Sequence, residues 1–522
     1  MSARVAIVGA GPVGTTLALL LAAQGVQSVL VDRAPSTTIE GSRALCQQRE
    51  VLDTWDVLGA GAIWREGVTW SVGRTYVRDR EVRVVRLADP GRSPLPAFVN
   101  ISQRRVEEVL AERVVANPAI EVRRGTEVTR IDQDDEGVVV VTDAGEIRAE
   151  LAILAAGAHA DSLRAGLGVE LVGESHPDRF LICDIEADLP EFAGERRFWF
   201  DPSWNPGRQV LIHAQPNGVF RIDWQVPEDF DLAAELASGG IEARVRAIVH
   251  DRPWRLVWAS VYRFHNRLAT SFLVGRVALV GDAAHLVSPF GARGLNSGVH
   301  DAENLAWKVA AVLAGASPWA LLDTYAHERR SAAEANLAAT RATMRFLAPA
   351  TAADRDRRRV ILEAAWAGEP EAIAQVDSGR LYVPACYADS PLTTPCPDRP
   401  FLGWGEDGLV IAPTPGMVLP DLVVPSGERL RALVRFAGAV IAPSWAGEAV
   451  ARIGVGTRCR PRVLELDEVD PEGVLRQALR LGEGEGVVVR PDGHIAGFAF
   501  DPAEAGRIAE RAVGLELAES GT

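Results

Sequence analysis

A glycine-rich segment near the N-terminus has the spacing of a phosphate-binding turn. Gly9, Gly11 and Gly14 form a G-x-G-x-x-G pattern that follows a strand-like apolar run (residues 5–8) and opens a helical stretch rich in Leu and Ala. In this pattern the first glycine permits a tight turn, the second lets a pyrophosphate approach the backbone, and the third lets the helix pack closely on the strand. The phosphates lie at the helix N-terminus, where free N–H groups favour negative charge. The segment therefore predicts a dinucleotide site.

An acidic residue stands where such a site needs one. Asp32 ends the next strand-like run, 28–32, eighteen residues after the last glycine, and it is placed to accept hydrogen bonds from an adenosine ribose. We include Pro12, Val13 and Arg33 with these residues in the predicted cofactor site. The alternative interpretation is a structural glycine turn with Asp32 at the surface. The pattern alone does not choose between NAD and FAD.

A second segment, far along the chain, has a complementary pattern. The apolar run 277–280 leads into Gly281 and Asp282, and a stretch with two further glycines follows at 289–296. A strand that ends in Gly-Asp can present a carboxylate to a chain of hydroxyl groups. The glycines let backbone N–H groups approach a flat ligand, and the next helix points its N-terminus at that ligand. Because a reduced flavin accumulates negative charge at one ring edge, a helix start there would stabilise it.

In this order the two segments resemble the para-hydroxybenzoate hydroxylase superfamily, the single-component FAD aromatic hydroxylases. The resemblance implies that Asp282 holds the ribityl chain, and that the backbone at Gly294 to Asn296 meets the isoalloxazine ring. It also implies that Arg43 and Gln103 lie along the pyrophosphate and ribityl parts, the alternatives being a surface cation and a helix-start residue. The matching residues are Gly9, Gly11, Gly14, Asp32, Ser42, Arg43, Ala44, Gln103, Gly281, Asp282, Ala283, Ala284, His285, Pro289 through Asn296 with Gly294 and Leu295 among them, and 304–308.

The resemblance also implies the reaction. NADPH or NADH would reduce FAD, O2 would add to the reduced flavin to give a C4a-hydroperoxide, and its distal oxygen would hydroxylate a phenolic or polycyclic aromatic substrate. We predict His213, Tyr262 and Arg293 as the catalytic side chains. His213 and Tyr262 lie on strand-like runs expected to cover the flavin, and ordinary packing in the sheet is their alternative role. Arg293 stands where many relatives carry glutamine, so it adds a cation near the flavin.

One position departs from the family pattern. After the strand-like run 151–154 the family usually has an Asp-Gly pair that contacts the cofactors, whereas this chain has Ala156 before Gly157. Asp161, a few residues later, is a candidate substitute. The departure bears on nicotinamide handling more than on FAD binding.

The predicted fold class is α/β. We expect a Rossmann-like FAD-binding domain, an inserted antiparallel-sheet substrate domain and a C-terminal thioredoxin-like domain, because 416–421 and 488–493 resemble the tails of phenol hydroxylase and 3-(3-hydroxyphenyl)propionate hydroxylase. The tail has no C-x-x-C motif, which predicts a structural or interface role without thiol–disulfide chemistry. The expected ranges are 1–175 with 266–382 for the FAD-binding domain, 176–265 for the substrate domain, 66–100 contributing to the substrate side, 383–400 for a proline-rich linker and 401–522 for the last domain.

The composition excludes several other classes. The 522 residues are 48% hydrophobic and 24% charged, as in a folded globular protein. A net charge of −15 disfavours nucleic acid or an anionic membrane as partner. Five scattered cysteines and no apparent signal peptide predict reduced thiols, no metal site and a cytoplasmic location. We expect a monomer or homodimer that acts on a small aromatic molecule.

Two other functions stay open at this point. A flavin oxidoreductase or epoxidase acting on a non-aromatic substrate would use a similar fold, since fold does not fix chemistry. A flavin-bound protein without turnover is the other, and Ala156 is the only feature that favours it.

Overall fold

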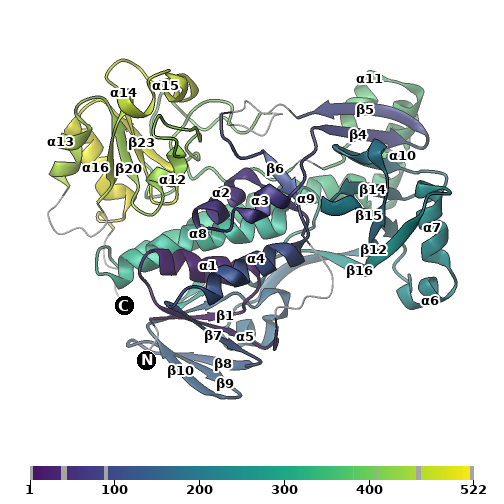
Figure 1. The fold of residues 1–522 in the computed structure, drawn as a ribbon, viewed down its shortest axis with the longest axis horizontal. Helices are drawn as coiled ribbons and strands as arrows, with labels where there is room; N and C mark the ends of the chain where they lie inside the picture. The colour runs from purple at the N-terminus through teal and green to yellow at the C-terminus, as the bar shows by residue number, and fades with distance from the viewer. Residues whose placement is uncertain are drawn as a thin grey trace.

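A six-stranded sheet in the order β17-β18-β11-β1-β2-β7, here called the central sheet, lies in the lower part of Figure 1. The structure is a computed structural model, which describes residues 4–36, 44–87, 92–379, 381–405, 410–453 and 460–517. All the strands except β17 run parallel to their neighbours, and they are short and mostly apolar because helices or other layers cover both faces. The strands are β1 (Val5–Val8), β2 (Ser28–Asp32), β7 (Ile120–Arg124), β11 (Leu151–Leu154), β17 (Leu273–Val274) and β18 (Val277–Leu279).

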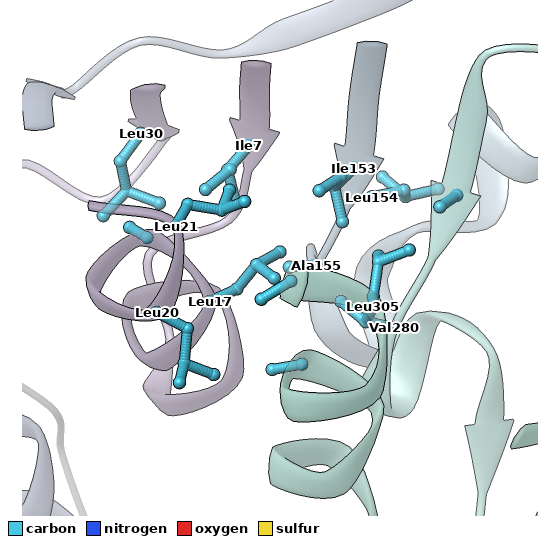
Figure 2. Packing of buried hydrophobic residues seen from close by; sticks show 14 of the residues in the cluster. Ile7, Leu17, Leu20, Leu21, Leu30, Ile153, Leu154, Ala155, Val280 and Leu305 are labelled. Atoms are coloured by element: carbon cyan, nitrogen blue, oxygen red, sulfur yellow. The ribbon is translucent and has the colours of Figure 1, made fainter. Parts of the chain in front are cut away.

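Two helices from distant parts of the sequence pack side by side against this sheet (Figure 2). Leu17 of one and Leu305 of the other are completely buried, close to Ile7 and Ile153 of the strands. Burial of this apolar layer stabilises the arrangement by roughly 25 cal/mol per Å² of surface removed from water. The helices around this core are α1 (Pro12–Ala23), α4 (Gln103–Val115), α8 (Arg293–Leu313) and α9 (Leu321–Leu347).

An eight-stranded sheet in the order β19-β16-β12-β15-β14-β13-β4-β5 forms the right-hand part of Figure 1. Its strands are antiparallel to their neighbours, except that β13 and β4 are parallel. Side chains alternate between its two faces: Leu181, Ile212 and Trp224 pack under two short helices, whereas Phe180 and Asp223 face the opposite side. The elements are β4 (Val72–Val77), β5 (Arg80–Arg86), β12 (Leu171–Ala187), β13 (Glu195–Phe200), β14 (Gln209–Ala214), β15 (Val219–Val226), β16 (Trp254–Ala269), β19 (His285–Leu286), α6 (Leu232–Ala237) and α7 (Gly240–Val249).

Smaller elements join these two sheets. A three-stranded sheet lies beside the central one, a two-stranded sheet contacts α8, and two helices after α9 pack near the eight-stranded sheet. These elements are β3 (Cys46–Gln48), β6 (Phe98–Asn100), β8 (Val128–Gln133), β9 (Val138–Thr142), β10 (Gly145–Ala149), α2 (Arg49–Val57), α3 (Ala62–Glu66), α5 (Asp161–Gly166), α10 (Ala352–Ala367) and α11 (Pro370–Gln375).

The last part of the chain forms a sheet of its own, in the order β21-β20-β22-β23. The first two strands are parallel and the last two add antiparallel, with α13 and α16 on one face and α12, α14 and α15 on the other. This is the topology of a thioredoxin fold, so the predicted fold class is confirmed. The elements are α12 (Leu430–Val434), β20 (Ala439–Ala442), α13 (Ala446–Arg452), β21 (Arg462–Glu465), α14 (Leu466–Val469), α15 (Val474–Leu479), β22 (Gly486–Val489), β23 (Ile495–Ala499) and α16 (Pro502–Ala512).

Buried charged side chains join this C-terminal unit to the central one. Glu328 of α9 accepts a hydrogen bond at 2.7 Å from Lys308 of α8, and hydrogen bonds at 2.5 and 3.0 Å from Arg490. Arg490 also donates to Asp492 at 2.6 Å, and all four side chains are buried. Burial acts against ionisation of Glu328, but Arg490 and Lys308 hold its pKa below the usual range. The group contains two acids and two bases, so its charges balance.

Two sequence expectations need comment. The alternation of apolar and polar residues over 68–72 is typical of a strand, but of the first four residues only Val68 forms a bridge, to Asn100, and regular pairing begins at Val72. Between them Trp70 turns into the interior, where its ring centroid lies 4.8 Å from that of Phe98. The expected domain ranges stay a proposal, supported by the separate sheets, although β12 and β16 extend the large sheet a few residues beyond 176–265.

Two general features concern membranes and metals. Within the described ranges, no helix is long and apolar enough to cross a membrane. In the same part of the chain, no group of His, Cys, Asp and Glu side chains is arranged to hold a metal ion.

Candidate functional site

A cavity of about 590 Å³ lies between the central sheet and the eight-stranded sheet. This volume is in the range of sites for small molecules and cofactors. The turn after β1, the loop at 281–283 and the start of α8 form one side, and the inward face of the eight-stranded sheet forms the other. The structure thus brings the two predicted glycine-bearing segments to one cavity.

The three glycines of the first segment have different structural roles. Gly9 has φ +111°, and a Cβ there would lie 2.3 Å from the carbonyl oxygen of Ala155. A Cβ on Gly14 would lie 2.0 Å from the carbonyl oxygen of Gly9, so this residue lets α1 pack on the turn. Gly11 lines the cavity, and a Cβ there would meet nothing within 4 Å. The fold therefore requires Gly9 and Gly14, whereas Gly11 keeps space free for a ligand.

Asp32 lies at the end of β2, beside this turn, and lines the cavity together with Arg33. Its Oδ2 accepts a hydrogen bond from the backbone N–H of Ala10 at 2.6 Å, and its Oδ1 accepts one from Ala34 at 2.8 Å. A carboxylate has about four acceptor positions, so Asp32 can hold the turn and still accept from ribose hydroxyls.

Helices α1 and α8 both begin at the cavity wall. Pro12 and Val13 line it at the start of α1, and Gly294 and Leu295 line it at the start of α8. The N-cap residues of these helices, Gly11 and Ala292, have no side-chain group that could cap the first turn. Their first N–H groups are therefore available to a ligand, and both helix dipoles favour negative charge there. A Cβ on Gly294 would meet nothing within 4 Å, so the cavity is open at this point also.

The side chain of Asn296 has a structural task. Its Oδ1 accepts from the backbone N–H of Gln48 at 2.9 Å, and its Nδ2 donates to the carbonyl oxygens of Cys46 at 2.9 Å and Ala292 at 2.6 Å. These bonds fix β3 to the start of α8. Asn296 and Pro289 both line the cavity, but it is the backbone of Asn296 that is left to meet a ligand.

The Gly281-Asp282 pair is held by a buried network. Asp282 lines the cavity, while Gly281, at φ +61°, donates its N–H to Asp301 Oδ2 at 2.9 Å. His285 Nε2 lies 2.8 Å from the same oxygen, and Arg329 Nε donates to Asp301 Oδ1 at 2.7 Å. Burial acts against ionisation of Asp301, but His285 and Arg329 hold its pKa below the usual range. His285 therefore supports the loop, away from the cavity.

Gln103 begins α4 and lines the cavity near the first segment. Its Oε1 accepts from the backbone N–H of Ala44 at 3.0 Å, and its Nε2 donates to Glu107 at 2.8 Å. Gln103 thus positions the chain that follows Arg43. Arg43 itself lies outside the described residues.

The sheet side of the cavity is polar. Arg196, His213 and Arg221 line it from three adjacent strands, and Asp223 lies two residues beyond Arg221 on the same face. Arg221 forms two hydrogen bonds, of 2.8 and 2.9 Å, with Asp184. Burial, together with Arg196 and Arg221, lowers the pKa of His213 well below its usual value, so this imidazole is neutral. Burial raises the pKa of Asp223 to about 7.

The other two predicted catalytic residues have different positions. Arg293 lines the cavity at the start of α8, and its Nη1 donates to Asn336 at 2.8 Å. Burial lowers its pKa, although a guanidinium stays protonated at neutral pH. Tyr262 is not among the lining residues, although Phe264, two residues further along β16, does line the cavity. The Tyr262 ring packs near Trp258, with centroids 6.3 Å apart. The structure therefore gives no support for a catalytic Tyr262.

Sequence reasoning missed Arg196 and Asp223. The signal was available in the period of two along a strand: Asp223 follows Arg221 by two residues, so the two share a face. Arg196 stands at an inward position of β13, where Phe198 and Phe200 share its face. A charge at an inward position of an apolar strand is costly unless it is paired, so such a residue is a candidate for binding a ligand.

The departure at Ala156 is visible in the cavity wall. Ala156 lines the cavity, whereas the side chain of Asp161 is 86% exposed and pairs with Arg164. The hypothesis that Asp161 replaces the missing family aspartate is therefore wrong, because the first turn of α5 carries it away from the cavity.

Comparison with known proteins identifies the family. Residues 2–340 match the family described as "FAD binding domain". The chain belongs to this FAD-binding family. A curated relative in Rhodococcus jostii (strain RHA1), named "Probable NADH-specific resorcinol 4-hydroxylase", is 33% identical over 351 residues, which are 62% of this chain and 62% of that protein. The chain thus spans less than two thirds of the length of this relative.

Two further proteins are similar to this chain over nearly its whole length, including its C-terminal part. The "6-methylpretetramide 4-monooxygenase" of Streptomyces rimosus is 29% identical over 544 residues, covering 94% of this chain and 90% of that protein. The crystal structure of the flavin-dependent monooxygenase PieE in complex with FAD and substrate matches with a TM-score of 0.82 and 22% identity, covering 98% of this chain and 99% of PieE. The resemblance to single-component FAD hydroxylases is thereby confirmed.

Proposed function

We propose that this flavoprotein is an FAD-dependent monooxygenase that uses NADPH or NADH and O2 to hydroxylate a phenolic or polycyclic aromatic substrate. The observation that supports it most is the cavity itself, which joins two uncapped helix N-termini to a polar sheet wall. The names of the relatives point to the same reaction class. A cytoplasmic location and a monomeric or homodimeric state stay predictions.

The residues of the cavity fit FAD. We propose that the backbone at Gly11 to Val13 holds the pyrophosphate, since the N–H groups at the start of α1 face the cavity. Asp32 would accept hydrogen bonds from the ribose and Asp282 from the ribityl hydroxyls, and the N–H groups at the start of α8 would stabilise negative charge on the reduced ring. When bound, FAD supplies hydride acceptance from the nicotinamide and activation of O2.

The residues of this chain position the ligands, stabilise charge in the cavity and exclude water from it. Arg293 and the N-terminus of α8 stabilise negative charge at the cavity, and the apolar lining, with Phe180, Phe264 and Phe290, excludes water. Asp223, with a pKa of about 7, is a lining group that can take or give a proton near neutral pH on the substrate side. The neutral imidazole of His213 can accept a hydrogen bond from a substrate hydroxyl.

A turnover assay tests the proposal. Purified protein loaded with FAD is expected to oxidise NADPH or NADH faster when a phenol is added, and to consume one O2 per hydroxylated product. Mass spectrometry of the product with heavy-isotope O2 should find one labelled oxygen. Acceleration with a non-aromatic substrate alone, or no reduction by either nicotinamide, would contradict the proposal in favour of the alternative functions.

Asp282→Ala is expected to weaken FAD binding by about 10- to 100-fold, because each hydrogen bond to a charged acceptor contributes roughly 1.5–3 kcal/mol. The measurement is the dissociation constant of FAD from the apoprotein, followed by quenching of flavin fluorescence. Asp161→Ala is the matched control, since this carboxylate points to solvent, and it should bind FAD as the parent does. An Asp282→Ala variant with unchanged affinity for FAD would contradict the proposed role of Asp282.

A further inference from the structure

The wall of the cavity opposite the two helix N-termini carries charges that the proposed FAD site does not use. Strand register places Arg196, His213 and Arg221 in one row across β13, β14 and β15, with Asp184 of β12 at its end. Asp223 lies in the next row, beside Leu211 of β14. The row is thus fixed to a rigid sheet, which is a suitable support for a specific binding site.

The two arginines of this row differ in their partners. Arg221 is neutralised by Asp184, with which it forms two hydrogen bonds. Arg196 is also buried, and among the described residues its guanidinium makes one hydrogen bond, from Nη2 to the carbonyl oxygen of Ser378 at 2.8 Å. Over the part of the chain that the structure describes, no carboxylate lies within ion-pair distance of Arg196. A guanidinium has five N–H donors, and a buried one without an anion is costly, so Arg196 has both the capacity and the reason to bind one.

Two neighbouring polar atoms also lack partners. Asp223 Oδ1 and His213 Nδ1 are buried, and neither has a hydrogen-bond partner among the described residues. Buried polar atoms are nearly always paired, so this pair of unmet groups points to a ligand that supplies oxygen atoms or hydroxyls. His213 is neutral, and Asp223 is partly protonated near neutral pH.

We propose that Arg196, flanked by His213 and Asp223, forms an anion subsite, and that the aromatic substrate carries an oxyanion such as a carboxylate next to a hydroxyl. The inference rests on the proposed function, since it names the substrate class of the same cavity. Arg196 pairs with the oxyanion, while His213 and Asp223 bond the hydroxyl. Arg293, from α8 on the other side of the cavity, adds positive charge.

The arrangement gives substrate binding a definite pH dependence. The groups facing Asp223 are Arg221 on its own strand, His213 and Arg196 from the next strands, Asp184 from β12 and Arg293 across the cavity. Ionised Asp223 lowers the net positive charge of this set from two to one and repels an anion. The affinity for an anionic substrate therefore falls as pH rises through about 7, the pKa of Asp223.

Equilibrium binding to the FAD-loaded protein, without nicotinamide, tests the subsite. The probes are 1-hydroxy-2-naphthoate and its methyl ester, measured by titration calorimetry near pH 6. The parent is expected to bind the acid at least about tenfold more tightly than the ester, the effect of one charge-assisted hydrogen-bond pair. Arg196→Met should lose this preference and Arg196→Lys should keep part of it. Asp223→Asn should make the acid's affinity independent of pH between about 6 and 8.

Arg197→Met is the matched control. Arg197 is the next residue of β13, faces the other side of the sheet and bonds Glu195 at 2.8 Å, so this variant should keep the full preference for the acid. A parent that binds the ester as tightly as the acid, or binds neither, overturns the subsite, as does equal loss in Arg197→Met. FAD content and NADPH oxidation with neutral phenols are followed in the same preparations. Loss of FAD or of NADPH oxidation counts against the proposed function. If both are kept but the protein shows no preference for the acid over the ester, the result counts against the subsite alone.

Discussion

Gly11→Ala is expected to abolish FAD binding while leaving the protein folded. Gly11 has φ −70°, which alanine adopts readily, and a Cβ there meets no protein atom within 4 Å. The methyl group instead projects into the cavity, where the proposal places the pyrophosphate. Loss of two charge-assisted hydrogen bonds at roughly 1.5–3 kcal/mol each corresponds to an affinity lower by about 100-fold or more. FAD titration measures the loss, and the unfolding of the apoprotein should be unchanged.

Gly14→Ala is the matched variant, and it should lower the stability of the apoprotein, which Gly11→Ala leaves unchanged. Its Cβ would lie 2.0 Å from the carbonyl oxygen of Gly9, so the turn or α1 must move, at a cost of about 3 kcal/mol for an overpacked core. We expect the apoprotein of Gly14→Ala to be destabilised or insoluble. If Gly11→Ala keeps FAD, or if it destabilises the apoprotein as much as Gly14→Ala does, the pyrophosphate does not lie at Gly11.

Glu328→Gln is expected to lower the free energy of unfolding by about 3–5 kcal/mol, the usual cost of breaking a buried ion pair. Glu328 and Asp492 balance Lys308 and Arg490, and the side chains are almost completely removed from solvent. Removal of one negative charge leaves an uncompensated cation at the junction with the C-terminal unit. Urea unfolding measures the change, and limited proteolysis of the 383–400 segment should report loosening of the junction.

Restoring the charge balance should restore much of this stability. The double variant Glu328→Gln with Lys308→Met removes one charge of each sign, so it should recover a large part of the loss. Glu516→Gln breaks a half-exposed pair with Arg511, and it should cost at most about 1 kcal/mol. A loss in Glu328→Gln no larger than that in Glu516→Gln would show that the buried charges do not hold the C-terminal unit in place.

The pH dependence of this junction follows from the same charges. The pKa of Glu328 is lowered in the folded protein, so its stabilisation is fully present above the unfolded value near pH 4.3 and is lost as pH falls below it. Acid should therefore loosen the C-terminal unit, while the Glu328→Gln variant should lose that part of the acid sensitivity. Unfolding followed between about pH 3 and pH 6 measures the difference.

The parts of the site with strong local signals were predictable from the sequence. Three local signals each join an apolar strand to a residue type that few other turns require: the glycine turn, Asp32 and Gly281-Asp282. The structure places all three at the same cavity. The role of each glycine was also predictable, because the need for space at Gly11 and contact at Gly14 follows from the geometry of a strand–turn–helix unit.

The substrate wall was harder to predict because its residues have no local pattern. Arg196 and Asp223 become neighbours only through pairing of β13, β14 and β15, and that register depends on side chains far apart in sequence. A catalytic Tyr262 stays a prediction for the same reason: its strand was recognised, but which side chains of β16 line the cavity depends on strand pairing across the sheet. Likewise, the turn that sends Asp161 to solvent could not be distinguished in the sequence from one that sends it inward.

The most direct test of the account is the FAD stoichiometry of the reconstituted parent protein, measured beside that of Gly11→Ala. We expect one tightly bound FAD per chain for the parent and none retained by the variant after gel filtration. A parent that takes up no FAD, or a variant that retains as much as the parent, would contradict the claim that the two glycine-bearing segments close on one flavin.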